Sequence, residues 1–320
     1  MSVLAHVVAS ISPASRAQAE AARRRIAAAG VPVLEPLAER LAGAQHTLHP
    51  RSARRTIVVA AGDHGAGDPG IALGASHPTV VAAHAIAGGS AALAEVARAS
   101  RAPIVLVDAG TVESAAMPAT AVRLGRGPSR NLLVEPAMTL VDAALALEAG
   151  IALAVSLADD PGLDLLAIGA LGVGSELAAA ALLGAALGSP PSNLGDPDAE
   201  AAGARGAALA DAGPSELLAA CGGPETALLA GLLLGAASMN IPTLLDGHAT
   251  GAAALVAARF APDVTGYLIA AHAGALVMPR ILAHLGLAPV FGVGLGHGEG
   301  TGAAMVLPLA DQVAALVARG

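Results

Sequence analysis

Short apolar runs rich in valine, isoleucine and leucine alternate with alanine-rich stretches of helical length along most of the chain. Such runs are typical of strands buried on both faces, and their alternation with helices favours a parallel sheet. The sequence therefore predicts an α/β fold with a mostly parallel, Rossmann-like sheet and helices on both faces. The predicted strands are Thr56–Ala60, Pro103–Val107, Ile151–Ser156, Asp164–Ile168, Ile241–Leu245, Tyr267–Ala271 and Pro289–Val293, and the helices include Thr79–Ala99, Thr139–Ala149, Glu176–Leu187 and Ala249–Phe260.

The first 55 residues depart from this alternation. Ser15–Ala29 is an Ala/Arg-rich helical stretch, and a second helical piece follows within residues 30–55. We therefore expect a helical arm, part of a smaller helical domain, over residues 1–55, and an α/β domain over residues 56–320. The arm would pack on the main sheet or on a partner chain. Within the larger domain, Ala116–Arg130 and Ser189–Gly213 are expected to be turn-rich insertions.

Composition restricts how the core is packed. Hydrophobic residues make up 55% of the chain, aromatic residues make up 1%, and there is no tryptophan. The core must therefore consist of Ala, Val, Leu and Ile packed closely with Gly. Small side chains allow helices to approach a sheet tightly, although each contact buries little area.

The charge balance argues against nucleic acid as a partner. All 17 basic residues are arginines, and 25 acidic residues bring the net charge to −8. No basic run is present to neutralise a phosphate backbone. The scarcity of aromatic residues also leaves little for stacking on bases.

The sequence favours a soluble, cytoplasmic protein with no membrane association. The longest uncharged stretch, Thr226–Leu245, has the length of about 20 residues that a membrane span needs. It contains Ser238, Asn240 and Pro242 and lacks flanking basic anchors, so a buried helix followed by a strand is expected. The N-terminus lacks the basic start of a signal peptide. The single cysteine, Cys221, excludes an internal disulfide and fits a reducing compartment.

Polar residues and glycines gather where the predicted strands end. Each could be an ordinary turn residue. However, the carboxyl ends of parallel strands share one edge of the sheet, where open α/β proteins bind ligands, so together they favour a site. The charged residues at these ends include Asp63, His64, Asp108, Asp159, Asp160, Asp246, His248, His272 and Glu299.

A glycine loop provides the most specific element of this predicted site. Gly169–Ser175 ends a predicted strand and opens a predicted helix. Backbone N–H groups and the helix dipole favour anion binding in such a position. Glu299 lies between two glycines, so a flat ligand can approach it closely, although a glutamate that complements a helix N-terminus is an alternative interpretation.

Two other interpretations are weaker. His84, His248 and His297 could converge at the site, but no i, i+4 pair supports zinc, so no metal is expected. Gly292–Gly298 is rich in glycine, but no βαβ unit with an acidic ribose ligand follows it. A dinucleotide-binding enzyme is therefore disfavoured.

Several segments carry a family resemblance. They are Ala61–Gly65, Glu135–Thr139, Gly222–Glu225, Ile241–Gly247 and Gly298–Ala304. In order and spacing they resemble the nicotinate-nucleotide:dimethylbenzimidazole phosphoribosyltransferases of cobalamin assembly, over residues 55–315. Members of that family transfer phosphoribose from nicotinate mononucleotide to a benzimidazole nitrogen. Nicotinate leaves, and α-ribazole phosphate forms.

The resemblance implies a role for each candidate residue and no metal or redox cofactor. Glu299 would be the general base that removes the ring proton. The family is generally dimeric, so a homodimer is expected. Phosphate and ribose would be bound by Gly172, Val173, Gly174, Ser175 and Asp246, and the base by Ser76, His84 and His297, with Asp63, His64, Glu225 and His272 as further strand-end site residues.

The chain departs from the family pattern at the phosphate loop. Ala170 stands where the family has Glu, Ser175 where it has Asn, and Glu176 where it has Thr. A family lysine has no counterpart because the chain contains no lysine, and Arg205 is the nearest substitute. Two hypotheses follow. The retained Glu299 favours an active transferase with a degraded phosphate site. The alternative is a paralogue that binds a nucleotide or base without catalysis, or the inactive subunit of a heterodimer with a catalytic sister.

Overall fold

The fold is built on a six-stranded parallel sheet, as the sequence predicts. The computed structural model describes residues 2–67, 70–295 and 298–319. The strand order is β3-β2-β1-β4-β5-β6, and every pairing is parallel. The strands are β1 (Arg55–Gly62), β2 (Ile104–Gly110), β3 (Val122–Arg123), β4 (Leu165–Leu171), β5 (Thr243–Leu245) and β6 (Leu268–Ala270).

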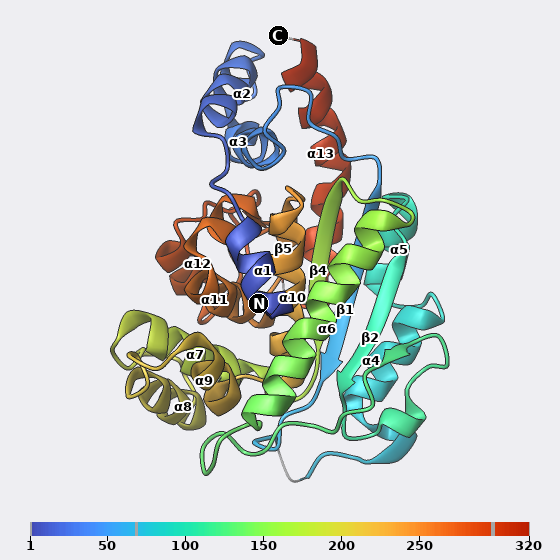
Figure 1. Cartoon of the computed structure of the whole chain (residues 1–320). Coiled ribbons are helices and arrows are strands. Elements are labelled where there is room, and N and C mark those ends of the chain that lie inside the picture. Colours follow the sequence, from blue (N-terminus) through green and yellow to red (C-terminus); the bar gives the residue numbers. More distant parts are fainter. Residues whose placement is uncertain (1, 68–69, 296–297, 320) are drawn as a thin grey trace.

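Helices cover both faces of the sheet (Figure 1). Side chains of a strand point alternately to its two faces. Accordingly, Val58 and Ala60 of β1 enter one core, and Ile57 and Val59 enter the other. The first core is closed by α6 (Leu140–Asp159), α10 (Pro224–Ser238) and α11 (His248–Phe260), and the second by α4 (Pro78–Ala87), α5 (Ala92–Ala99) and α13 (Thr301–Arg319).

The remaining helices lie around these two layers. The first core extends into a group of three helices, α7 to α9. They and the other outer elements are α1 (Val3–Ser10), α2 (Arg16–Ala28), α3 (Glu35–Ala44), α7 (Ser175–Leu187), α8 (Pro197–Ala207), α9 (Pro214–Cys221) and α12 (Met278–Leu285), with short 3-10 turns at Pro32–Leu34, Gly74–Ser76, Ser114–Ala116 and Pro262–Tyr267.

Glycines allow α6 and α10 to pack against each other at backbone distance. A Cβ on Gly150 of α6 would lie 1.9 Å from the carbonyl oxygen of Leu228. A Cβ on Gly231 of α10 would lie 1.8 Å from the carbonyl oxygen of Leu147. No side chain fits at either position. This is the close packing that a core nearly free of aromatic residues requires.

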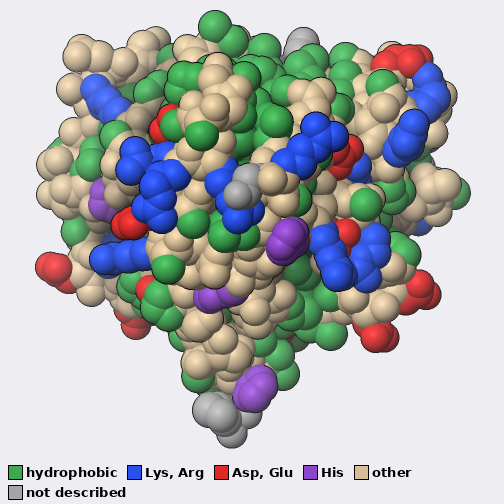
Figure 2. All heavy atoms as spheres, turned by 90° about the horizontal axis from the view of Figure 1, so that it is seen from above, with side chains coloured by type: hydrophobic (Ala, Val, Ile, Leu, Met, Phe, Trp, Pro, Cys, Tyr) green, Lys and Arg blue, Asp and Glu red, His purple; other side chains and the backbone are tan. Residues whose placement is uncertain are grey.

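The N-terminal residues divide into two packing groups. Helix α1 packs against α6 and α10, whereas α2 and α3 pack together against the C-terminal half of α13. Ile26 and Leu41 share the second core with Val313 and Val317. In Figure 1 this group lies beyond the amino ends of the strands, remote from the edge where the strands end. Figure 2 looks down on this end of the molecule, where arginine side chains gather although the whole chain is acidic.

The single tyrosine ties the N-terminal segment to the sheet domain. Tyr267 is buried, and its hydroxyl lies 2.8 Å from the carbonyl oxygen of Ser12 and 3.0 Å from Oδ1 of Asn240. The side chain therefore joins the connection between α1 and α2 to the turn that follows α10. Burial and the charge of Asp263 raise the pKa of Tyr267, against the hydrogen bond to Ser12.

Four sequence predictions about secondary structure are wrong. Ile151–Ser156 is not a strand but continues the helix predicted at Thr139–Ala149, so both belong to α6. Pro289–Val293 forms only one bridge, between Phe291 and His272. Thr79–Ala99 is two helices, because the chain turns at Gly88–Ala91. Ser189–Gly213 is not only turns, because α8 lies within it.

Several helical segments are apolar enough to raise the question of a membrane. By length and composition, Pro78–Ala99, Leu140–Asp159 and Thr301–Arg319 would each suffice to cross one. The first is interrupted between α4 and α5. The second packs against α10, and the third packs against β4 and β5. The uncharged stretch 226–245 is a buried helix followed by a strand, as predicted.

Candidate active site

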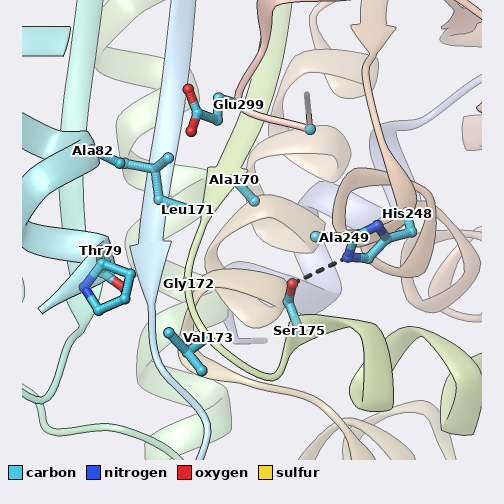
Figure 3. Close-up of a pocket in the computed structure, with 12 residues that line it drawn as sticks. Thr79, Ala82, Ala170, Leu171, Gly172, Val173, Ser175, His248, Ala249 and Glu299 are labelled. Carbon is cyan, nitrogen blue, oxygen red and sulfur yellow. Dashed lines mark hydrogen bonds between the residues drawn. The ribbon is translucent and has the colours of Figure 1, made fainter. Parts of the chain in front are cut away.

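A cavity of about 240 Å³ opens at the carboxyl end of β4 (Figure 3). The strand order reverses between β1 and β4, and this reversal point is where open α/β sheets bind ligands. Glu299 lies near Ala82 and Leu171, which form an apolar wall of the cavity. Ser175 and His248 lie on the opposite side of the cavity. The cavity is lined by Pro78, Thr79, Ala82, Ala170, Leu171, Gly172, Val173, Ser175, His248, Ala249, Gly298 and Glu299.

The glycine loop after β4 has the geometry expected for its motif. A Cβ on Gly172 would lie 1.8 Å from the carbonyl oxygen of Gly62, so β1 and the loop touch through backbone alone. Gly174 has a φ of +84° and forms the N-cap of α7, a conformation that favours glycine. Helix α7 then begins at Ser175. The N–H of Leu177 donates to the carbonyl oxygen of Gly174 at 3.2 Å, whereas the N–H groups of Ser175 and Glu176, at the very start of the helix, have no acceptor within it.

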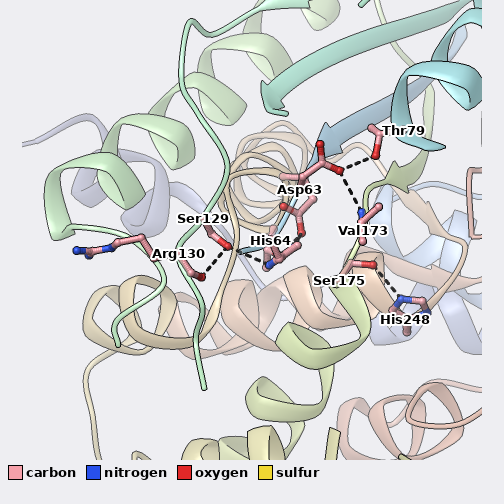
Figure 4. Close-up of polar contacts among 10 residues, drawn as sticks. Asp63, His64, Thr79, Ser129, Arg130, Val173, Ser175 and His248 are labelled. Carbon is pink, nitrogen blue, oxygen red and sulfur yellow. Dashed lines mark hydrogen bonds and ion pairs between the residues drawn. The ribbon is translucent and has the colours of Figure 1, made fainter. Parts of the chain in front are cut away.

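Asp63 holds this loop in place through hydrogen bonds (Figure 4). Its carboxylate accepts hydrogen bonds from the Thr79 hydroxyl at 2.5 Å and from the backbone N–H of Val173 at 3.1 Å. A third bond comes from the backbone N–H of Val112 at 2.9 Å. Asp63 is 1% exposed, so it joins the start of α4 to two loops and does not face the cavity. The N–H of Val173, a predicted anion donor, is already engaged by this carboxylate.

His64 and Glu225 form a buried ion pair beside Asp63. Nε2 of His64 lies 3.0 Å from Oε1 of Glu225, and Nδ1 of His64 lies 3.2 Å from the hydroxyl of Ser129. Both side chains of the pair are 0% exposed. Glycine is required around them, because a Cβ on Gly62 or Gly223 would lie 2.5 Å from Oε2 of Glu225. This contact explains the glycines in the Gly-Asp-His-Gly and Gly-Gly-Pro-Glu motifs.

The pair is held in its charged form. Burial opposes the charge on His64, but the carboxylate of Glu225 and its hydrogen bond outweigh burial, and the pKa of His64 is raised. Burial likewise opposes the charge on Glu225, and His64 with the Thr226 hydroxyl outweighs it, so the pKa of Glu225 is lowered. The pair therefore places a compensated charge under the glycine loop rather than a free acid or base in the cavity.

Asp246 organises the segment that carries Glu299. Its two carboxylate oxygens accept the backbone N–H groups of Gly300 at 2.7 Å and Ala303 at 3.1 Å. Nε2 of His272 donates to the same carboxylate at 3.1 Å, because Nδ1 of His272 accepts from the N–H of Gly274 at 3.0 Å. Asp246 and His272 are both buried and lie behind the cavity wall. They fix the start of α13 and hence the backbone of Glu299.

A serine–histidine pair occupies the side of the cavity opposite Glu299. The hydroxyl of Ser175 lies 3.1 Å from Nε2 of His248, and these residues begin α7 and α11. Burial lowers the pKa of His248, although the charges of Glu176 and Glu225 act in the opposite direction. Glu176 itself is exposed, so its carboxylate reaches solvent.

The predicted base-binding residues do not converge on this cavity. Ser76 and His84 are exposed, and Nε2 of His84 donates to the carbonyl oxygen of Ala116 at 2.9 Å. His297 lies outside the described residues. Arg205, the expected substitute for a lysine, lies on α8 and does not line the cavity. Within the described ranges, no group of three His, Cys, Asp or Glu side chains is arranged to hold a metal ion.

Two residues that line the cavity, Thr79 and His248, have contacts that the sequence does not predict. Thr79 forms the floor of the cavity and binds Asp63. The signal available was its position directly after Ser76–Pro78, but nothing in the sequence indicated its partner. His248 was named as a polar strand-end residue, yet only the fold pairs it with Ser175, which is 73 positions away.

Known proteins provide the context for this site. A phosphoribosyltransferase family model matches residues 10–319. The nicotinate-nucleotide–dimethylbenzimidazole phosphoribosyltransferase of Bradyrhizobium diazoefficiens is 35% identical over 298 residues, covering 88% of this chain and 85% of the relative. The enzyme of the same name from Desulforudis audaxviator is 33% identical over 348 residues, covering 99% and 96%.

A solved structure agrees with the sequence matches. The nicotinate-nucleotide–dimethylbenzimidazole phosphoribosyltransferase from Thermus thermophilus superimposes with a TM-score of 0.82 at 30% identity, over 95% of this chain and 96% of that one. The similarity thus covers nearly the whole chain. On these matches the chain belongs to the nicotinate-nucleotide–dimethylbenzimidazole phosphoribosyltransferase family.

Proposed function

We propose that this protein transfers phosphoribose from nicotinate mononucleotide to a benzimidazole-type base, giving α-ribazole phosphate and nicotinate. One observation carries the proposal. A single cavity presents a carboxylate beside an apolar wall and, on its other side, a polar corner made by two helix N-termini. These two halves fit an aromatic acceptor and an anionic donor. Family membership over nearly the whole chain supports the same reaction.

The acceptor base fits the half of the cavity around Glu299. Ala82, Leu171 and Pro78 supply an apolar wall on which a flat ring can lie. A ring nitrogen attacks C1′ of the ribose, a bond from that nitrogen to C1′ forms, and the bond from C1′ to nicotinate breaks. Glu299 accepts the proton from the other ring nitrogen, which preserves electron density on the attacking atom. The products are α-ribazole phosphate, free nicotinate and one proton held by Glu299.

The donor phosphate fits the corner formed by Ser175 and His248. The first-turn N–H groups of α7 and α11 and the Ser175 hydroxyl are neutral donors suited to a phosphate. Among the described lining residues there is no arginine, so no guanidinium takes part in binding the phosphate at this corner. Gly172 and Gly174 contribute by letting the loop approach the ligand as backbone.

The buried carboxylates act as positioning groups in this mechanism. Asp246 and His272 hold the backbone of Glu299, and Asp63 holds Val173 of the glycine loop. The His64–Glu225 pair supports the same loop from beneath. None of these five side chains lines the cavity.

Catalytic competence is supported despite the substitutions in the phosphate loop. Glu176 is exposed, so solvent screens its repulsion of a bound phosphate. Ala170 leaves the loop backbone intact, with its N–H bonded to the carbonyl oxygen of Gly298 at 3.1 Å. These features favour an active enzyme over a degraded one.

The assembly and location follow from the same proposal. We expect the protein to form a homodimer. We also expect residues 1–55, which include the arginine-bearing helices α2 and α3, to form a smaller helical unit. A protein acting on a free nucleotide and a free base is expected in the cytoplasm. Neither a metal nor a redox cofactor takes part in the proposed chemistry.

The test is release of nicotinate, measured by chromatography after incubation with nicotinate mononucleotide and dimethylbenzimidazole. We expect nicotinate and α-ribazole phosphate to appear in equal amounts. Calorimetric titration with each substrate separately tests the two halves of the cavity. Binding of the base alone, with no turnover, would contradict the proposal and favour the inactive subunit of a heterodimer. Binding of neither nicotinate mononucleotide nor dimethylbenzimidazole would mean that this protein binds a different ligand.

A further inference from the structure

The Ser175–His248 pair has a property that the proposed reaction does not use. His248 is the first residue of α11, and its imidazole lines the cavity at the corner where α7 begins. Its Nε2 lies 3.1 Å from the Ser175 hydroxyl, whose backbone opens α7. An imidazole is the one donor among the described groups at this corner that can gain a positive charge within the physiological pH range.

The charged groups around His248 come from three elements. Glu176 faces it from α7, Glu225 from α10, and His64 from the segment after β1. Glu299 lies across the cavity. Glu225 and His64 compensate each other, and Glu176 is exposed. A phosphate entering the corner is therefore the strongest uncompensated charge that His248 can meet.

We propose that His248 recognises the substrate phosphate as an imidazolium and takes up a proton from solvent when the phosphate binds. The inference rests on the proposed function, because it assigns the phosphate of the donor nucleotide to this corner. In the empty enzyme the Ser175 hydroxyl donates to unprotonated Nε2. In the complex the added proton sits on Nε2, Nε2–H donates to the Ser175 oxygen, and the serine hydroxyl turns to a phosphate oxygen. One N–H bond forms on Nε2, and one bond to hydrogen breaks in the buffer acid or hydronium ion that supplies the proton; no other covalent bond changes.

The direction of the linkage follows from charge. Burial holds the pKa of His248 below its usual value of 6.5 in the empty enzyme, so the imidazole is neutral at neutral pH. A phosphate dianion beside it raises that pKa. Phosphate binding therefore strengthens as the pH falls through the raised value and weakens as the pH rises above it. Each unit by which binding raises the pKa corresponds to about tenfold in affinity.

The experiment is calorimetry of nicotinate mononucleotide binding at pH 7 in buffers with different enthalpies of ionisation. The slope of the observed heat against the buffer enthalpy gives the number of protons taken up. His248→Gln is the matched variant, because glutamine keeps a hydrogen-bonding group but cannot titrate. We expect net proton uptake to be greater in the wild type than in His248→Gln, whose residual proton exchange reports the ionisation of the phosphate itself. Equal uptake in the two proteins would overturn the inference.

A measurement on the unmodified protein covers the case in which the variant does not fold. Nitrogen-15 NMR of histidine-labelled wild-type protein reports the protonation of imidazole nitrogens. We expect one imidazole to change from neutral to charged when ribose 5-phosphate is added at pH 7. No change in any histidine at saturating ribose 5-phosphate would count against the inference. Ser175→Ala is expected to weaken ribose 5-phosphate binding, because the hydroxyl that contacts the phosphate is lost.

The two proposals fail separately. Proton uptake on binding of ribose 5-phosphate, with no nicotinate released from the mononucleotide, would sustain the role of His248 and reject the transferase. Normal release of nicotinate, with equal proton uptake in the wild type and His248→Gln, would support the transferase and reject the role of His248. Failure of the wild type to bind either phosphate compound would reject both.

Discussion

The carboxylate of Asp246 accepts the backbone N–H of Gly300 at 2.7 Å, which fixes the peptide that directly follows Glu299. The proposed base thus lies one residue from a buried anchor that is itself held by His272. A glutamate between two glycines would otherwise have a flexible backbone. The anchor supplies the rigidity that a general base needs for a constant distance to its proton.

Glu299→Gln should abolish most turnover and leave the fold intact. The amide is nearly isosteric but cannot accept the ring proton, and loss of a general base costs about 10²–10⁴ in rate. The measurement is nicotinate release at saturating substrates, with circular dichroism as the check on folding. Glu176→Gln is the control, because this exposed glutamate lies near the same cavity but is not one of its lining residues. Unchanged turnover in Glu299→Gln would remove that residue from the mechanism.

Asp246→Asn should reduce turnover through Glu299 rather than through binding of the base. The new amide places an N–H₂ group against backbone donors, which leaves about 1–3 kcal/mol of unsatisfied polar groups. We expect kcat to fall while KM for the base changes little, and the acid limb of the pH–rate profile to shift. A loss of stability with an unchanged pH–rate profile would indicate a structural role only.

The His64–Glu225 pair should stabilise the fold most between pH 4.5 and 6.5. The raised pKa of His64 gives a contribution that is complete below 6.5 and is lost as the pH rises through the folded-state value. The lowered pKa of Glu225 gives one that is complete above 4.5 and is lost as the pH falls through its folded-state value. His64→Gln should cost about 3–5 kcal/mol at pH 5.5, because it leaves a buried charge unpaired.

Urea unfolding of wild type and His64→Gln at pH 5.5 and 8.5 measures this effect. The difference in free energy of unfolding between the two proteins should shrink at the higher pH. The double variant His64→Gln/Glu225→Gln should be more stable than His64→Gln alone, because no unpaired charge remains. A difference independent of pH would show that the pair contributes through packing alone.

Gly231→Ala should destabilise the protein although alanine favours helices. The helical preference gains about 1 kcal/mol. Against it, the new Cβ would lie 1.8 Å from the carbonyl oxygen of Leu147, so α6 and α10 must separate. Such overpacking costs typically about 1–3 kcal/mol, and a backbone clash lies at the upper end. Gly127→Ala is the control, since its Cβ meets nothing within 4 Å. Equal melting temperatures would contradict the close contact.

Cys221 should be unreactive in the folded protein. Burial raises the pKa of its thiol to about 11, against the charge of Arg205, so little thiolate exists at neutral pH. Reaction with a disulfide reagent should therefore proceed at the rate of unfolding and become fast in urea. Rapid labelling without denaturant would mean that α9 opens readily.

The sequence was sufficient to predict the sheet, because its strands are short apolar runs ended by polar residues and glycine. It failed at Ile151–Ser156 for a physical reason. Helix α6 packs on α10 but also carries exposed apolar residues, including Leu145 and Val155, so its apolar residues do not follow a clear helical period. A short apolar run is then ambiguous between strand and helix. Pro289–Val293 failed differently. The N–H groups of Val290 and Phe291 donate to the carbonyl oxygens of Ala270 and Ala271, but the pairing forms only one bridge, which is too short to make a strand.

The candidate site was predictable in its backbone and less so in its side chains. The glycine loop and Glu299 follow from local motifs, and both line the cavity. The roles of Asp63 and Asp246 could be recognised only from the folded structure. Each was expected among the ligand-facing residues, yet each is buried and bonded to backbone N–H groups from distant segments. A sequence pattern gives the position of a carboxylate along the chain but not the direction in which it points.

With no tryptophan and a single tyrosine, the chain carries one dominant ultraviolet chromophore, and that chromophore sits where the N-terminal segment meets the sheet domain. Its absorbance and emission therefore report the attachment of this one junction rather than an average over the molecule. Detachment of the segment around Ser12 would expose the phenol and lower its ionisation midpoint. An alkaline titration followed at 295 nm would then resolve local release of the helical arm from global unfolding, without any added label.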